Sequence, residues 1–262
     1  MNPVLLLHGQ PGGAGDWDRV RARLDRPAQT LAIDRPGWDR HSRPADLHGN
    51  AEAALAALDA WGASRAVVVG HSFGGAVAAW LAAFYPARVV ALVLVSPAAN
   101  RASLYRLDRW LAAPLSGEVA SVATLVSLGL ALAAGPVRRR VAEELTLDDR
   151  YLRGASRMLL APAAWRAYAA EQRVLMRDLP ALETRLGAIS TATTIIAGTD
   201  DRIVPGASAR QLARQIPGAQ LTLVEGAGHL LPQQKPERLA DVIAAAATGR
   251  AGLPPAGGRA SA

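Results

Sequence analysis

Short apolar runs alternate along the chain with longer segments in which apolar residues recur at helical spacing. The short runs predict strands at Val4–Leu7, Thr30–Ile33, Arg65–Val69, Val89–Val95, Thr193–Ala197 and Gln220–Val224. The longer segments predict helices near Trp17–Leu24, His48–Trp61, Gly74–Phe84, Ala207–Ile216 and Pro236–Ala247. Almost wholly apolar strands that alternate with helices are typical of a mostly parallel sheet covered on both faces. The pattern therefore predicts an α/β fold.

One stretch, from about Asn100 to Leu186, interrupts this alternation because it contains helical patterns only. Helices inserted between two strands of an α/β sheet are expected to lie as a cap over the strand ends. We therefore divide the chain into an α/β core of residues 1–99 and 187–247 and a helical cap of residues 100–186. The tail of residues 248–262 is rich in Gly, Pro and Ala, and we predict it to be disordered.

Within the cap, Val119–Ala134 is strongly apolar. A membrane span needs about 20 such residues, whereas this run is shorter and is interrupted by Ser121, Thr124, Ser127 and Gly129. We predict a cap helix that lines an apolar pocket. Contact with a membrane surface, aided by the basic run Arg138–Arg140, is the alternative interpretation.

Composition excludes several classes of function. The 262 residues include no cysteine, which rules out disulfides, thiolate metal sites and cysteine nucleophiles. The formal net charge is +7, but the arginines are scattered and no aromatic platform or zinc-ligand spacing accompanies them, so no nucleic-acid partner is expected. The chain enters its first apolar run without the basic segment and cleavage site of a signal peptide. We therefore expect a cytoplasmic protein.

The most specific motif is Gly70-His71-Ser72-Phe73-Gly74, which has the form G-x-S-x-G. A predicted strand precedes the motif and a predicted helix follows it. A sharp turn between the two strains the serine backbone, and small residues two positions to either side relieve the crowding. Such a turn exposes the serine hydroxyl at the C-terminal edge of the sheet, near a helix N-terminus that favours developing negative charge. Ser72 is therefore the candidate nucleophile.

A serine hydroxyl becomes a strong nucleophile only when a base takes its proton. Among the five histidines, His229 follows the last predicted strand within Gly226-Ala227-Gly228-His229 and is the candidate base. We expect the turn to direct His71 elsewhere and His8 to be structural. His41 and His48 are expected at the surface or the pocket rim.

A carboxylate should orient the imidazole and stabilise its charged form. Asp200 and Asp201, which follow the penultimate strand, both qualify, and we prefer Asp201. Acyl transfer also needs donors for the oxyanion. His8-Gly9-Gln10-Pro11-Gly12-Gly13 follows the first strand, and the backbone N–H groups of Gln10 and Phe73 are the candidate donors; a plain Gly-Pro turn is the alternative. The absence of a lysine and a following hydroxyl residue excludes a P-loop.

Together these motifs, with Asp34-Arg35-Pro36-Gly37, resemble the α/β-hydrolase superfamily, in particular its capped bacterial esterase and haloperoxidase-like branch. The resemblance extends to about Ala247. It implies that the order along the chain is Ser72, Asp201, His229, and it implies that the residue after His8-Gly9 supplies an oxyanion-hole amide. Members of the superfamily commonly have two further strands before the one at Val4, so we expect about six strands and a less protected sheet edge. A second departure is Asp39, where a small residue is usual.

The resemblance implies a serine hydrolase that cleaves a small or medium apolar carboxylic ester or lactone through an acyl-enzyme, without metal or cofactor. Carbon–carbon bond hydrolysis, amide cleavage or cofactor-free perhydrolysis with the same residues is the first alternative, because fold and triad do not choose the reaction. A non-catalytic ligand-binding module on the same fold is the second. The expected partner is a small apolar molecule, without membrane contact, and the sequence does not define the oligomeric state.

Overall fold

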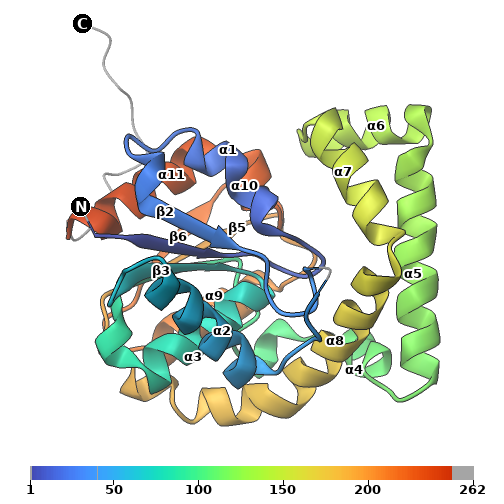
Figure 1. The fold of residues 1–262 in the computed structure, drawn as a ribbon. Coiled ribbons are helices and arrows are strands. Elements are labelled where there is room, and N and C mark those ends of the chain that lie inside the picture. Colours follow the sequence, from blue (N-terminus) through green and yellow to red (C-terminus); the bar gives the residue numbers. More distant parts are fainter. Residues whose placement is uncertain (1, 40, 250–262) are drawn as a thin grey trace, which may run out of the picture.

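Six parallel strands form one sheet in the order β2-β1-β3-β4-β5-β6 (Figure 1). The computed structural model describes residues 2–39 and 41–249. The strands are β1 (Val4–Leu7), β2 (Thr30–Ile33), β3 (Ala66–His71), β4 (Val89–Val95), β5 (Thr193–Gly198) and β6 (Gln220–Val224). The prediction of a six-stranded parallel sheet flanked by helices is confirmed.

Helices connect successive strands. The α-helices are α1 (Asp18–Arg21), α2 (Leu47–Ala60), α3 (Phe73–Phe84), α4 (Arg106–Leu111), α5 (Ser116–Ala133), α6 (Gly135–Leu145), α7 (Asp149–Leu159), α8 (Pro162–Glu183), α9 (Gly206–Gln215), α10 (Leu231–Gln234) and α11 (Pro236–Thr248). Short 3-10 turns are η1 (Ala14–Trp17), η2 (Pro27–Gln29), η3 (Pro86–Arg88), η4 (Arg101–Ser103) and η5 (Leu186–Ala188).

The predicted helix at Trp17–Leu24 is wrong in its bounds. In its place the chain forms η1, in which the Asp16 carboxylate accepts the Gly13 N–H, and then the single turn α1. This local side-chain bond satisfies a backbone donor and starts the helical turn earlier than the apolar spacing indicates.

Alternate residues of each central strand point to opposite faces of the sheet, as a strand's side-chain period of two requires. On one face Leu5, Leu7 and Val68 join a core with residues of α2, α3, α8 and α9. On the other face Val67 and Val69 join a second core with residues of α1, α10 and α11. The edge strands are less covered, because most residues of β2 and all residues of β6 after the exposed Gln220 are only partly buried.

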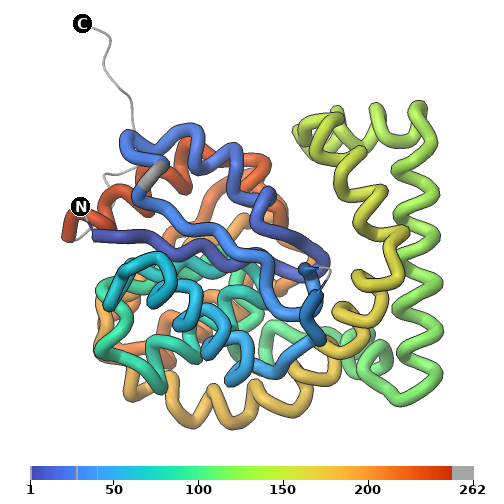
Figure 2. Tube along the Cα trace, in the orientation of Figure 1, coloured from blue at the N-terminus to red at the C-terminus, as the bar shows by residue number. Residues whose placement is uncertain are grey.

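The helices α4 to α7 lie beside the sheet, beyond the end at which β1 and β2 finish (Figure 1). Leucines of α5, α7 and the α6–α7 connection form a separate apolar cluster against Trp165 and Tyr168 of α8. The following half of α8 instead joins the main core through Val174, Leu175, Leu179 and Leu182, and Figure 2 shows the helix running from the cap to the α3 side of the sheet. The domain boundary at residue 186 stays a prediction, and the change of packing environment lies earlier, within α8.

Helix α5 contains most of the apolar run that the sequence assigned to the cap. Its window of 18 residues has a mean hydropathy of 1.5, and among the described residues α5 is the one helix that is long and apolar enough to cross a membrane by length and composition. Its buried stripe, which includes Leu125 and Leu132, packs in the cap cluster, whereas Val119 is 71% exposed. In the structure α5 thus packs within this leucine cluster and leaves one apolar side exposed; that it belongs to a cap and lines an apolar pocket stays a prediction.

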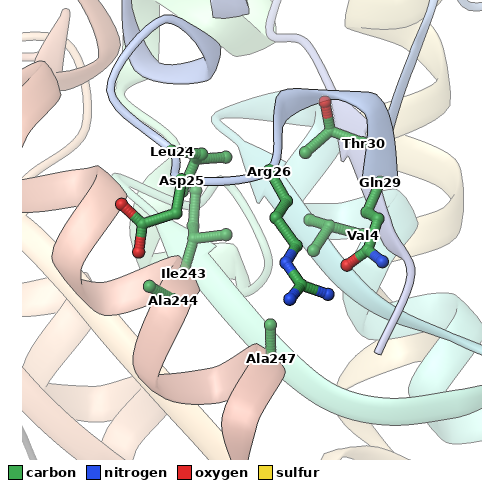
Figure 3. A pocket seen from close by; sticks show the side chains of 9 residues that line it. All are labelled: Val4, Leu24, Asp25, Arg26, Gln29, Thr30, Ile243, Ala244 and Ala247. Carbon is green, nitrogen blue, oxygen red and sulfur yellow. The ribbon is translucent and has the colours of Figure 1, made fainter. Parts of the chain in front are cut away.

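A small pocket lies at the opposite end of the sheet, between the start of β1, the loop before β2 and α11 (Figure 3). Its volume of about 10 Å³ is close to the space of one water molecule. It is therefore too small to bind a substrate. The predicted disordered tail of residues 248–262 is wrong at Thr248, which is the last residue of α11, and its residues 250–262 lie outside the described part of the chain.

Candidate active site

Ser72 lies in the sharp turn between β3 and α3. Its backbone has φ 53° and ψ −118°, a conformation that costs free energy for a non-glycine residue. The turn is possible only because glycines flank it at close approaches. A Cβ atom on Gly70 would lie 2.1 Å from the Gly74 carbonyl oxygen, and one on Gly74 would lie 2.4 Å from that of Leu7. The two glycines of the G-x-S-x-G motif therefore have a steric reason.

Hydrogen bonds to neighbouring segments hold this strained turn. The Ser72 N–H donates to the Val95 carbonyl at 3.0 Å, and the Ser72 carbonyl accepts from the amides of Gly75 and Ala98 at 2.9 and 3.0 Å. The residue is 5% exposed and immediately precedes the first turn of α3. Its side chain is thus placed at the C-terminal end of β3, beside a helix N-terminus.

His229 and Asp201 form a buried pair at the same end of the sheet. His229 Nδ1 and Asp201 Oδ2 are 2.8 Å apart, and the other oxygen of Asp201 accepts the amides of Ile203 and Val204 at 2.9 Å each. Burial opposes ionisation of Asp201, but the hydrogen bond and charge of His229 and the two amides outweigh it and hold the pKa of this carboxyl below its ordinary value. The carboxylate is therefore ionised at neutral pH.

The neighbouring Asp200 has a different environment. It is exposed, and its carboxylate accepts the hydroxyl of Thr199 at 3.1 Å. Of the two adjacent aspartates that the sequence offered, Asp201 is thus the one that the structure pairs with His229.

The remaining histidines fall into two groups. His41 and His48 are exposed, and His8 is fully buried, where its Nε2 accepts the Arg35 N–H at 3.0 Å. The turn at Ser72 directs His71 toward the His229 loop, and no hydrogen bond joins its ring to the Ser72 hydroxyl among the described residues. Its ring lies 4.8 Å from the ring of His229 between centroids, and its Nε2 donates to the His229 carbonyl at 2.9 Å.

Burial is the main cause that sets the charge state of His71. Burial, together with the nearby His229, lowers the pKa of His71 to about 3, although its hydrogen bond to the His229 carbonyl works in the opposite direction. His71 is therefore neutral and acts as a donor that supports the His229 loop. The sequence could not show this contact, because it depends on the strained turn at Ser72.

Ser72 and His229 belong to the same end of the sheet, but no hydrogen bond joins the Ser72 hydroxyl to the His229 ring among residues 2–39 and 41–249. Such a bond is often long or absent without substrate. The structure thus brings Asp201 and His229 into direct contact. Ser72 is connected to this pair through its neighbour His71, whose ring contacts His229.

The loop after β1 packs directly on the turn. A Cβ atom on Gly9 would lie 3.0 Å from the Ser72 Cβ and 2.9 Å from His71 Nδ1. Gln10 follows Gly9, and Phe73 follows Ser72. Neither backbone amide donates to a protein acceptor within the described residues. The two predicted oxyanion donors therefore belong to segments in mutual contact.

The helices that we predicted to form a cap contact the loop that carries His229. Leu230, which follows His229, packs against the leucine cluster of the cap. A cleft of about 740 Å³ lies between α7 and the loop after β1, and its lining mixes Trp38, Tyr151 and Met158 with charged residues such as Arg19. Ser72, Asp201 and His229 are not among the residues that line it. Within the described part of the chain no group of three or more His, Asp or Glu side chains is arranged to hold a metal ion.

The sequence did not indicate a functional role for two residues that the structure places near the site. Arg35 was treated as part of a structural turn, and Glu171 of the cap was not singled out, yet the two form a fully buried ion pair. A sequence pattern for Glu171 does exist. It occupies the apolar stripe of α8 with Ala164, Ala167 and Val174, where a lone carboxylate needs a partner.

With this fold and site, the chain belongs to the alpha/beta hydrolase family, whose model matches residues 4–242. It is 28% identical to a 2-hydroxymuconate semialdehyde hydrolase of Pseudomonas putida over 92% of this chain and 85% of the relative. An alpha/beta hydrolase fold protein from Burkholderia ambifaria is 26% identical, with a TM-score of 0.76, over 92% of this chain and 89% of its own.

A thermophilic esterase from Thermogutta terrifontis shares the fold at 23% identity, with a TM-score of 0.67 over 93% of this chain and 88% of its own. The predicted family and the α/β-hydrolase fold are confirmed. Membership also supports a hydrolase as the class of enzyme.

Proposed function

We propose that this hydrolase cleaves a small or medium apolar carboxylic ester or lactone through an acyl-enzyme on Ser72. The observation that supports this most directly is the buried His229–Asp201 hydrogen bond at the sheet end where Ser72 lies. A serine nucleophile needs a base, and the base needs a carboxylate that sets its tautomer and stabilises its charged form. The three side chains supply these parts.

In the first half-reaction the Ser72 oxygen attacks the carbonyl carbon, and its proton passes to Nε2 of His229. The carbonyl oxygen becomes an oxyanion, for which the backbone N–H groups of Gln10 and Phe73 are the donors. The intermediate then expels the alcohol, which takes the proton from His229. Asp201 remains ionised and pairs with the transient imidazolium.

In the second half-reaction a water molecule gives a proton to His229 and attacks the acyl carbon. The second tetrahedral intermediate expels the Ser72 oxygen, which recovers the proton, and the carboxylic acid leaves. These steps balance without a metal or cofactor. The apolar substrate is inferred from the cap, because its leucine cluster contacts Leu230 beside the proposed base.

Carbon–carbon bond hydrolysis is the second candidate, and the similarity to the 2-hydroxymuconate semialdehyde hydrolase favours it. The same nucleophile and base would serve, but the leaving group would be a carbon that must be protonated. The two candidate reactions are therefore distinguished by which substrates are turned over, because the same catalytic residues would serve both.

Labelling with a fluorophosphonate probe tests the nucleophile. We expect the wild-type protein and the control Ser190→Ala, which alters an exposed serine, to be labelled and Ser72→Ala to remain unlabelled. Equal labelling of Ser72→Ala and the wild type would reject the proposal.

A second experiment identifies the substrate class. Purified protein is assayed with p-nitrophenyl esters of increasing acyl length and with 2-hydroxymuconate semialdehyde, the compound in the name of the relative. Turnover of only the semialdehyde would favour carbon–carbon bond hydrolysis, and tight binding without any turnover would favour a non-catalytic binding module.

A further inference from the structure

A buried ion pair connects the cap to the loop that precedes the proposed oxyanion donor. Arg35 lies on the loop after β2 and is 1% exposed, and Glu171 of α8 is 0% exposed. The Glu171 carboxylate accepts from both terminal nitrogens of Arg35, one of them at 3.3 Å, and from the Trp38 indole N–H at 2.9 Å. Charged groups this deeply buried are rare unless they are paired.

The opposite side of the guanidinium holds the loop after β1. Arg35 Nε donates to the His8 carbonyl at 2.8 Å, and Arg35 Nη2 donates to the Gly9 carbonyl at 2.9 Å. His8 Nδ1 lies 2.7 Å from the same Gly9 oxygen, while its Nε2 accepts the Arg35 N–H. His8 thus acts as a second donor to Gly9.

The Gly9 carbonyl and the Gln10 N–H belong to one peptide unit. A trans peptide is planar, so its C=O and N–H groups point in opposite directions. Because Arg35 and His8 hold the Gly9 oxygen on one side, the Gln10 N–H must point to the other side. Rotation of this peptide would break both hydrogen bonds and leave one buried N–H of Arg35 Nη2 without an acceptor.

The same guanidinium also packs against the second donor residue. Its central carbon lies 4.5 Å from the centroid of the Phe73 ring, within the range of a cation–π contact. Arg35 therefore contacts the residues on both sides of the proposed oxyanion hole, whereas Glu171, from the cap, supplies the negative charge that keeps this cation buried.

We propose that Arg35 is a positioning residue that orients the Gln10 N–H toward the oxyanion, and that Glu171 holds Arg35 in this role. The inference rests on the function proposed above. Oxyanion donors contribute in the transition state more than in the bound substrate, so loss of their orientation lowers kcat and leaves KM nearly unchanged. A purely structural ion pair would change the thermal midpoint without this separation.

The test compares the wild type with a double variant, Arg35→Met plus Glu171→Leu, which removes both buried charges together. A buried pair replaced by apolar residues often keeps its stability. Arg35→Lys is the second variant, since it keeps the charge but lacks the fork that spans both carbonyls. The control is Glu118→Leu with Arg173→Met, a partly exposed pair whose arginine lies two residues after Glu171. Folding is verified by circular dichroism melting.

Loss of one oxyanion donor costs about 10²–10³ in rate, so we expect kcat for a p-nitrophenyl ester to fall about 100-fold in the double variant and about tenfold in Arg35→Lys. KM should change less than about threefold, and the Ki of a phenylboronic acid inhibitor should rise with the fall in kcat. The control pair should retain both constants. A kcat within about threefold of the wild type in either folded variant would overturn the inference.

The fluorophosphonate label separates this outcome from failure of the proposed function. If the wild type is labelled at Ser72 and the variants match its kcat, only the role of Arg35 is rejected. If the wild type is not labelled at Ser72, the proposed function and this inference are rejected together.

Discussion

Replacement of Asp201 by asparagine separates the charge and tautomer effects from packing at the proposed base. Asparagine has nearly the same shape, and its oxygen can still accept the amides of Ile203 and Val204. Its amino group then faces His229 Nδ1, which in the wild type lies 2.8 Å from a carboxylate oxygen. Nδ1 must then accept, so the proton moves to Nε2, and the ring can no longer take the proton of Ser72.

The expected magnitude follows from the same contact. With charge centres about 4 Å apart and an effective dielectric constant of about 20, a carboxylate stabilises an imidazolium by about 4 kcal/mol. This corresponds to about 10³ in rate, and the tautomer effect brings the expected loss to about 10³–10⁴. The loss should be in kcat, because the imidazolium forms during the reaction and is absent from the bound substrate.

The assay is steady-state hydrolysis of a short p-nitrophenyl ester at neutral pH, with urea unfolding to verify that the variant is folded. Asp200→Asn is the matched control, since this neighbouring residue is exposed and its carboxylate accepts a hydrogen bond from the Thr199 hydroxyl. We expect the control to retain kcat within about threefold. A larger loss in Asp200→Asn than in Asp201→Asn would refute the assignment of the carboxylate.

Three further predictions concern stability and location. The pKa of His71 is about 3 in the folded protein and about 6.5 in the unfolded chain. Below pH 6.5 the unfolded chain binds a proton that the folded protein does not bind, so the free energy of unfolding falls as the pH falls from 6.5 toward 3. His71→Gln, unlike exposed His48→Gln, should therefore reduce the difference in urea-unfolding free energy between pH 7 and pH 5 by about 2 kcal/mol; an unchanged difference would contradict this. Gly74→Ala should destabilise the fold by about 1–3 kcal/mol, because its Cβ would lie 2.4 Å from the Leu7 carbonyl oxygen. Gly154→Ala in α7 is the matched control, because its Cβ would meet no atom within 4 Å, and it should stabilise the fold by about 0.5–1 kcal/mol. Equal melting temperatures of the two variants would show the steric reasoning to be wrong. Hydroxyl residues interrupt the exposed side of α5, so the protein should stay in the aqueous fraction with anionic vesicles, and flotation with the lipid would reject this expectation.

The sequence predicted the sheet well because each strand is a short, almost wholly apolar run between longer segments with helical spacing. The bounds of β1 and β4 agree with the apolar runs, and β3 and β5 extend to His71 and Gly198, beyond the predicted ends. Those extensions are polar or glycine residues at the sheet end where the site forms. The apolar pattern therefore ends before the strand does, because the last residues of these strands serve the turn and the site and not the core.

Contacts across the fold were less accessible to sequence reasoning. The choice between Asp200 and Asp201 is a question of side-chain direction, and the structure answers it by burying only Asp201. The position of the His71 ring depends on a positive φ at the next residue. The pairing of Arg35 with Glu171 joins residues 136 positions apart, which no local pattern specifies.

The packing of α8 also bears on how the cap could move relative to the site. Its first half packs with the cap cluster through Trp165 and Tyr168, and its second half is part of the main core from Val174 onward. Glu171 lies at the junction, one turn before the core section and already bonded to Arg35. A hinge between α7 and α8 would therefore move the leucine cluster while Glu171 stays with the sheet. We accordingly expect the loop after β1 to keep its orientation even if α5 to α7 move, because the charge that neutralises Arg35 belongs to the part of α8 fixed on the core.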